Sequence, residues 1–95
     1  MPALDAPAGP LAPATDLVLT GANLTAVDRV FLWPDRGLQA PAEVIERAPD
    51  ALAARQITLA RAGLDADGLR AIRYRAAARF GPNRYTQFVI VEVER

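Results

Sequence analysis

Cysteine, histidine, serine and lysine are all missing from this chain of 95 residues. Without cysteine there is neither a disulfide nor a thiolate, and without histidine the commonest general base and the commonest transition-metal ligand are lost. Nucleophilic arrangements of the Ser-His-Asp or Cys-His type are therefore excluded within one chain. The sequence predicts a protein that is not an enzyme and that needs no cofactor and no metal ion.

An excess of charge of either sign is also lacking, because eleven arginines balance eleven acidic residues. A dedicated nucleic-acid-binding domain is usually basic, so the zero net charge argues against nucleic acid as the partner. No apolar run approaches the roughly 18 residues that span a membrane, and the first residues lack the features of a secretory signal. We expect no membrane insertion, and a location in a virion or other assembled particle or else in the cytoplasm.

Proline is concentrated at the N-terminus, where its spacing disfavours helix and sheet ladders and favours extended backbone. The sequence predicts two parts, an arm at residues 1–14 and a folded domain at residues 15–95. A disordered tail is one alternative for the arm; the other is an arm that docks on its own domain or on a partner. Deletion of residues 2–13 is then expected to leave thermal unfolding nearly unchanged and to abolish partner binding. The candidate docking residues are Pro2, Leu4, Pro7, Pro10, Leu11 and Pro13.

From residue 15 onward, short alternating runs are separated by turn residues roughly every ten positions, which is typical of a β-sandwich. Leu17, Leu19, Ile57 and Leu59 are expected to face the core, and so are Ile72 and Tyr74. The predicted strands include residues 15–20, 26–33, 42–48, 54–61, 69–78 and 85–94, with turns at 34–37, 49–52 and 80–84 and a loop at 62–68. About seven strands in this length favour an all-β, immunoglobulin-like sandwich without its disulfide.

The stretch "LVLTGANLTAVDRVFL" at residues 17–32 resembles the start of the IPT/TIG family of immunoglobulin-like domains. Gly21 is expected to allow a positive φ, and Asn23 to hold the turn by hydrogen-bonding to nearby backbone. Leu24 is then expected to return to the core. The resemblance implies an accessory module, such as a receptor or adhesin repeat, a spacer in a carbohydrate enzyme, a DNA-contacting domain or a phage appendage. The matching positions are Thr20, Gly21, Asn23, Leu24, Val30 and Leu32.

Two aromatic residues make the first candidate binding site. If the strand at 26–33 alternates regularly, Phe31 and Trp33 face away from Val30 and Leu32. With Arg36 nearby, they could then stack on a sugar ring or fill a partner's pocket. If a bulge follows Phe31, Trp33 instead turns inward as the core aromatic.

The last strand makes the second candidate site. Phe88 and Ile90 alternate with Val89, Val91 and Val93, so that both faces of the strand are apolar. Such a strand is usually covered on both sides, and the second cover is expected to be the arm or a partner protein. Arginines of the neighbouring stretch are expected to pair with carboxylates such as Glu43 and Glu46 rather than with phosphates. These arginines are Arg70, Arg73, Arg75, Arg79 and Arg84.

These patterns predict a structural or binding module, namely a decoration or accessory protein of a phage head or tail or of a tail-like particle. Its partner would be the major structural protein of that assembly. The alternative is a carbohydrate-binding or adhesive immunoglobulin-like module with a glycan as ligand. A third possibility is an accessory domain of a larger surface protein or enzyme.

Overall fold

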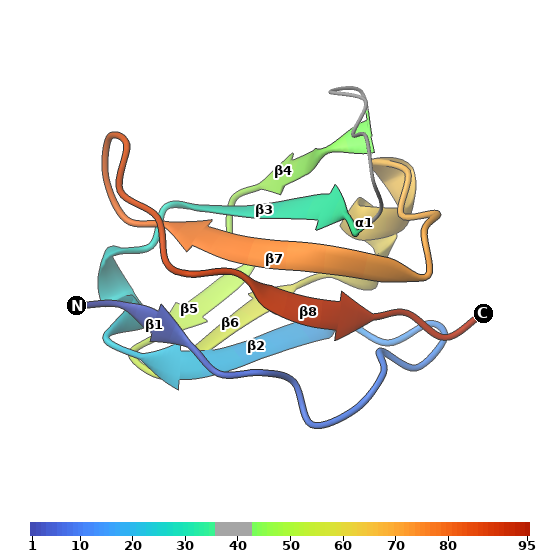
Figure 1. Ribbon diagram of the computed structural model, residues 1–95, viewed down its shortest axis with the longest axis horizontal. Coiled ribbons are helices and arrows are strands. Elements are labelled where there is room, and N and C mark those ends of the chain that lie inside the picture. Colours follow the sequence, from blue (N-terminus) through green and yellow to red (C-terminus); the bar gives the residue numbers. More distant parts are fainter. Residues whose placement is uncertain (36–42) are drawn as a thin grey trace.

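The computed structural model describes residues 1–35 and 43–95. Within these residues eight strands form two four-stranded sheets, and the helices are short (Figure 1). The elements are β1 (Ala3–Leu4), β2 (Leu17–Ala22), the 3₁₀ helix η1 (Leu24–Ala26), β3 (Arg29–Pro34), β4 (Ile45–Arg47), β5 (Ala51–Ala53), β6 (Gln56–Leu59), α1 (Arg61–Ala66), β7 (Arg73–Arg79) and β8 (Val89–Glu92). Of the predicted turn at 34–37, only Pro34 and Asp35 lie within the described residues, and Pro34 ends β3.

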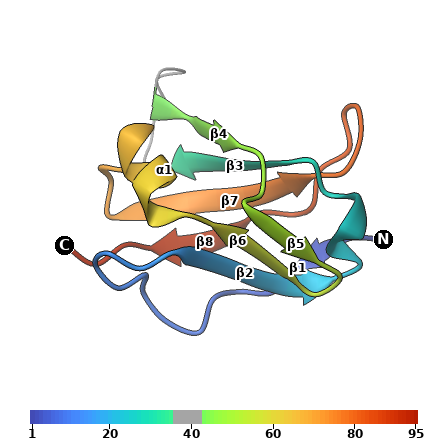
Figure 2. The same cartoon turned by 180° about the vertical axis from the view of Figure 1, so that it is seen from behind.

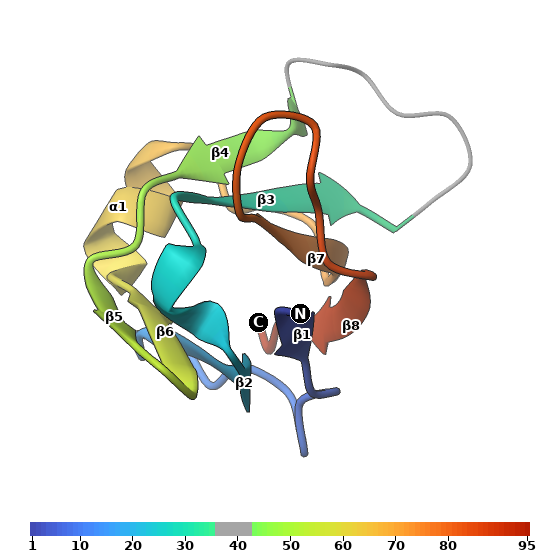
Figure 3. The same ribbon diagram turned by 90° about the vertical axis from the view of Figure 1, so that its left-hand side faces the viewer.

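The two sheets face each other, as the view along them shows (Figure 3). The strand order is β1-β2-β6-β5 in the first sheet and β4-β3-β7-β8 in the second, and the paired strands are antiparallel. The all-β prediction is therefore confirmed. Eight strands are described rather than about seven, because β1 lies in the predicted arm and β5 begins inside the predicted turn at 49–52.

The core lies between the sheets and follows from the alternation of apolar residues along the strands. Leu17 and Leu19 of β2 pair with Leu59 and Ile57 of β6, and all four are buried as the sequence predicts. Leu24 is also buried, as expected. The facing sheet contributes Val30, Leu32, Ile45, Tyr74, Ala76, Ala78 and Val91.

The loop predicted at residues 62–68 is wrong, because α1 occupies most of it at one end of the sheets (Figure 2). Leu64 anchors the helix in the core. Two carboxylates satisfy backbone N–H groups at its start: Asp50 accepts from Ala60 at 2.8 Å and Asp16 accepts from Arg61 at 2.9 Å. Both acids are distant in sequence, so the local pattern does not reveal that these donors are satisfied.

Ile72 is the one predicted core residue of its strand that the structure places outside. Its side chain is 69% exposed, because β7 begins only at the next residue. Tyr74 is buried as predicted, and its hydroxyl accepts hydrogen bonds from the backbone N–H groups of Arg70 and Ala71 at 2.9 and 3.0 Å. These bonds fold the preceding segment back over Tyr74, which breaks the alternation expected from Ile72 onward.

The first part of the arm is a strand of its own domain. β1 pairs with β2, with Ala3 opposite Ala22 and Leu4 opposite Gly21. The N–H of Asp5 continues this pairing by donating to the carbonyl of Thr20 at 2.8 Å. Leu4 packs against the core cluster. The N-terminal arm is thus docked on the first sheet.

A second anchor ties the arm to the other sheet. Leu11 forms a parallel bridge with Val93; its N–H donates to Glu92 at 2.7 Å, and its carbonyl accepts from Glu94 at 2.9 Å. The Leu11 side chain also packs against the core. Between its anchors the arm therefore crosses from one sheet to the other.

The Thr-Gly-x-Asn stretch holds the arm rather than forming a turn at glycine. Gly21 is part of β2, and the positive φ of 59° falls on Asn23 instead, so the expectation of a positive φ at Gly21 is wrong. A Cβ at Gly21 would collide with the carbonyl oxygen of Ala3, and the Asn23 amide donates to the carbonyl of Met1 at 3.3 Å. Glycine is required here by the close approach of β1.

Candidate functional site

Aromatic side chains gather on the outer surface of the β4-β3-β7-β8 sheet. The register between β3 and β7 is continuous from Arg29 opposite Arg79 to Pro34 opposite Tyr74, so no bulge interrupts the alternation. Val30 and Leu32 are buried, whereas Phe31 and Trp33 lie on the outer side and stack with their ring centroids 5.8 Å apart. The alternative in which Trp33 joins the core is therefore excluded.

The connection between β7 and β8 supplies two more rings. Tyr85 meets Phe31 edge to face at 5.7 Å and is 48% exposed, and Phe88 is 52% exposed. Thr86 fixes this connection: its N–H donates to Ala78 at 2.9 Å, and its buried hydroxyl accepts from Ala78 at 3.0 Å. We call the surface formed by Phe31, Trp33, Tyr85 and Phe88 the aromatic face.

A pocket of about 430 Å³ opens on the aromatic face. Ala77 contributes its floor: the residue points outward between the inward Ala76 and Ala78, and only 4% of it is exposed. Because alanine is small, the surrounding rings rise above it and leave the hollow. The lining residues are Trp33, Ala77, Tyr85, Thr86, Gln87 and Phe88.

The arginines of this sheet are engaged by acids at the edge of the aromatic face. Arg73 and Arg75 both pair with Asp35, at 3.0 and 2.8 Å. Arg79 makes two hydrogen bonds to Asp28, at 3.1 and 3.0 Å. These acids differ from the predicted Glu43 and Glu46, because the ends of β3 bring Asp28 and Asp35 beside β7. Glu46 instead pairs with Arg29, at 3.6 Å.

Two guanidinium groups also lie over rings of the aromatic face. The Arg75 guanidinium is 4.9 Å from the Phe88 ring centroid, and that of Arg79 is 5.9 Å from Phe31. The hydrogen bonds from Arg79 lower the pKa of the Asp28 carboxyl, and Asp28 in turn raises the pKa of Arg79. The ion pairs with Asp35 and Asp28 thus hold the two guanidinium groups in place over the rings.

The structure brings some of the predicted site residues together and leaves others apart. Phe31, Trp33 and Phe88 share the aromatic face, and Ile90 lies beside them, opposite Arg75 in the β7–β8 register. Arg36 lies outside the described residues. Of the predicted docking residues of the arm, Pro2 and Leu4 line a hollow with Tyr85, Thr86 and Gln87, whereas Leu11 is bridged to Val93.

Tyr85 and Ala77 belong to the site but were not predicted for it. Tyr85 precedes the regular part of β8 and reaches the aromatic face through an isolated bridge to Arg79. Alternation along β7 could have indicated Ala77, since it separates the outward Arg75 and Arg79. Its importance comes from its small size below the rings, which becomes visible only when the neighbouring strands are placed.

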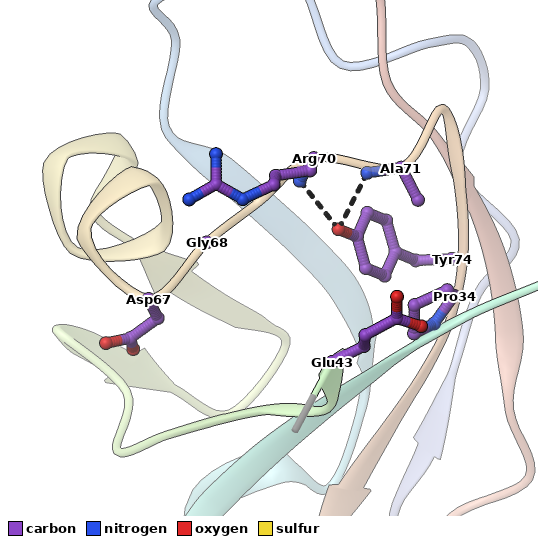
Figure 4. A pocket seen from close by; sticks show the side chains of 7 residues that line it. All are labelled: Pro34, Glu43, Asp67, Gly68, Arg70, Ala71 and Tyr74. Carbon is purple, nitrogen blue, oxygen red and sulfur yellow. Dashed lines mark hydrogen bonds between the residues drawn. The ribbon is translucent and has the colours of Figure 1, made fainter. Parts of the chain in front are cut away.

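A second pocket, also of about 430 Å³, lies at the end of the sheets near α1 (Figure 4). Figure 4 shows the Tyr74 hydroxyl directed at the backbone of Arg70 and Ala71, while the carboxylate of Asp67 points elsewhere. Asp67 is engaged by Arg47, at 3.0 Å. Tyr74 and Asp67 thus serve the fold at this pocket. The lining residues are Pro34, Glu43, Asp67, Gly68, Arg70, Ala71 and Tyr74.

Replacing Tyr74 by phenylalanine tests this structural role. The Tyr74→Phe variant leaves the N–H groups of Arg70 and Ala71 without their acceptor, so we expect the free energy of unfolding to fall by about 1–3 kcal/mol. Urea unfolding followed by circular dichroism measures this change. Tyr85→Phe is the matched control, because the Tyr85 hydroxyl bonds to no acceptor in the described part of the chain, and its unfolding midpoint should not move. Equal midpoints for Tyr74→Phe and wild type would contradict the assignment.

Neither a metal cluster nor a membrane-spanning helix is found in the parts of the chain that the structure describes. No protein-family model matches the sequence, and the searches of curated proteins and of solved structures returned no match. The chemistry of the aromatic face therefore carries the functional argument.

Proposed function

We propose that this chain is a non-enzymatic, immunoglobulin-like binding module that docks on a protein partner through its aromatic face. The partner would be a structural protein of a larger particle, such as a phage head or tail. The particle is suggested by the sequence alone, whereas the docking surface is argued from the contacts of the second sheet. The single observation that carries the proposal is the exposed ring cluster around a pocket, bordered by ion pairs.

The immunoglobulin-like part of the proposal is supported by the strand order. The sheets β1-β2-β6-β5 and β4-β3-β7-β8 correspond to strands A-B-E-D and C′-C-F-G of that architecture. Tyr74 near the start of β7 bonds to backbone three and four residues upstream, as the tyrosine corner of such domains does. Ala76 then stands where disulfide-bearing members have their second cysteine. The narrower IPT/TIG assignment rests on the Thr20–Leu24 motif.

The arrangement of the aromatic face supports docking on a protein. Interfaces typically have an aromatic centre depleted in charge and a polar rim, and their tightest contacts are often made by tryptophan, tyrosine and arginine. Here the centre holds Trp33, Tyr85 and Phe88. The two arginines that lie over rings of this face, Arg75 and Arg79, are paired with acids within the chain. A partner therefore need not supply compensating charges. We infer that binding depends only weakly on salt.

Carbohydrate remains the second candidate, and one observation favours it. Half-exposed rings flank Gln87, whose amide can bond to sugar hydroxyls while a ring stacks on the sugar face. The same residues would thus serve a glycan. The two candidates share the pocket and differ in the ligand.

A displayed library of random peptides, panned on the protein, separates these candidates. Panning should enrich peptides that bind the wild type and do not bind the Ala77→Arg variant. In this variant the arginine side chain fills the floor of the pocket. Ile72→Arg is the control, because Ile72 is exposed away from the aromatic face, and binding should persist. If the enriched peptides bind the Ala77→Arg variant as tightly as the wild type, the protein-partner proposal is overturned. It is also overturned if a glycan array, and not the peptide library, yields a pocket-dependent ligand.

A further inference from the structure

We propose that the N-terminal arm regulates the aromatic face: the pocket binds its ligand tightly while β1 is paired with β2, and weakly once β1 is released. The inference rests on the proposed function, because it names the regulation of the same surface. It is argued from a hollow that the arm shares with the pocket residues, from the register between β7 and β8, and from the ring contacts of Tyr85.

The arm and the pocket have one segment of chain in common. Tyr85, Thr86 and Gln87 line the pocket of the aromatic face, and the same three residues line a hollow of about 300 Å³ together with residues 1–4. Figure 1 shows the N-terminus and the β7–β8 connection at the same end of the sheets, opposite α1. The connection is therefore part of the wall of both spaces, and the start of the arm is the other wall of the hollow.

The ladder between β7 and β8 is interrupted at this segment. Tyr85 is bridged to Arg79, whereas Val89 is paired with Ala76. Four steps along the connection, from 85 to 89, thus match only three along β7, from 79 to 76. The extra residue makes a β-bulge, which leaves the ladder locally disrupted. Backbone pairing alone therefore does not fix this wall of the pocket.

Thr86 is the fixed point of the bulged segment, through its two hydrogen bonds to Ala78. The side chains of Tyr85 and Gln87, on either side of it, form no hydrogen bond among the described residues. Packing sets their positions, and the hollow is the space that lies open to them. Residues 1–4 bound this space while β1 is in place. Once β1 leaves, Tyr85 and Gln87 have room to turn away from the pocket.

Ring contacts carry a displacement of Tyr85 to the far side of the pocket. Tyr85 meets Phe31 edge to face at 5.7 Å, and Phe31 stacks on Trp33 at 5.8 Å. Neither Phe31 nor Trp33 lines the hollow with the arm, so the arm acts on them through Tyr85. A contiguous set of packed side chains of this kind can couple two sites.

The start of the arm can be released without unfolding the domain. β1 is only two residues long, and the N–H of Asp5 adds one hydrogen bond to Thr20. Terminal segments held by few bonds open at a lower free energy than the whole domain unfolds. The second anchor, Leu11 on Val93, lies on the other sheet and does not depend on β1. Pairing and release of β1 are therefore two states of a folded protein.

Coupling between the arm and the pocket acts in both directions. If release of β1 weakens binding by a certain factor, a bound ligand makes that release rarer by the same factor. A partner that captures the arm would then lower the affinity of the pocket. Conversely, a ligand in the pocket holds the arm on its own domain.

Gly21→Ala tests the coupling in the protein without ligand, because the added Cβ meets the carbonyl oxygen of Ala3 and forces β1 away from β2. In the ¹⁵N-labelled variant we expect the signals of residues 85–87 to move, and with them that of the Trp33 indole N–H. Gly9→Ala is the matched control: a Cβ there meets nothing within 4 Å, and the Trp33 signal should keep its wild-type position.

A shortened chain that lacks residues 2–5 removes the same wall without placing a side chain inside β2. It should move the Trp33 indole signal as Gly21→Ala does. If this signal stays at its wild-type position in the shortened chain, the inference is overturned, whether or not Gly21→Ala folds.

Binding of a pocket-dependent peptide from the displayed library tests the direction of the effect. We expect Gly21→Ala to bind it about five- to tenfold more weakly than Gly9→Ala. In the wild type, saturating peptide should slow hydrogen exchange of the Asp5 N–H by the same factor. This group donates to Thr20, and Asp5 does not line the pocket, so the ligand cannot shield it directly.

The outcomes separate this inference from the proposed function. If Gly21→Ala and Gly9→Ala bind the peptide equally, or if the peptide leaves the exchange of the Asp5 N–H unchanged, the regulation by the arm is overturned and the proposed function stands. If the library yields no pocket-dependent peptide, both fail.

Discussion

Deleting residues 2–13 is expected to lower the free energy of unfolding by about 2–5 kcal/mol. The deletion removes the apolar contacts of Leu4 and Leu11 and the backbone hydrogen bonds of β1 and of Leu11, each bond contributing about 1 kcal/mol. Domains of this size are stable by only about 5–15 kcal/mol, so the loss is a large fraction of the total. The contacts thus argue against the expectation from sequence that deletion leaves unfolding nearly unchanged. Urea denaturation of the two forms gives the difference.

Two glycine substitutions test whether the pairing of β1 with β2 stabilises the fold. Gly21→Ala places a Cβ against the carbonyl oxygen of Ala3 and should reproduce much of the deletion, because β1 can no longer pair with β2. Gly9→Ala is the matched control: a Cβ there meets nothing within 4 Å, so stability should be unchanged or slightly higher. A Gly21→Ala protein as stable as Gly9→Ala would show that the arm contributes little to the fold.

Truncating Trp33 or Phe88 to alanine is expected to lower affinity for a pocket-dependent peptide by about thirtyfold or more. This corresponds to a contact of at least about 2 kcal/mol, the usual range for aromatic residues at the centre of an interface. The fold should survive both changes, because these side chains lie on the outer surface and leave the buried Val30 and Leu32 in place. Isothermal titration calorimetry measures the affinity, and circular dichroism confirms folding.

Ile72→Ala is the control for these truncations. The Ile72 side chain is apolar and is more exposed than that of Phe88, but it does not line the pocket. The affinity of this variant should equal that of the wild type. If Ile72→Ala weakens binding as much as Trp33→Ala, the aromatic face is not the specific contact.

Alternation along the β2–β6 pair was enough to predict which of its residues face the core. The sequence correctly places Leu17, Leu19, Ile57 and Leu59 inside, because regular antiparallel strands alternate with period two. Phe31 and Trp33 follow as outward residues once a bulge is excluded. That exclusion requires the register against β7, which the sequence does not contain.

Features that depend on distant partners could not be predicted in the same way. The start of α1 is satisfied by Asp16 and Asp50, which are remote in sequence, and Gly21 is needed because β1 passes close to it. Tyr85 joins the aromatic face through a single bridge to Arg79 rather than through a regular strand. In each case the determining contact is tertiary, so local propensity and alternation carry no signal for it.

The most direct test of the central claim is a map of where a ligand binds. Amide and indole chemical shifts of the ¹⁵N-labelled protein can be recorded while the strongest peptide from the displayed library is added. If the aromatic face is the binding site, the largest chemical-shift changes should fall on the Trp33 indole N–H, on Ala77 and on residues 84–88. Changes confined to the arm at residues 1–11 or to the edge strand β5, with Trp33 and residues 84–88 unmoved, would contradict it.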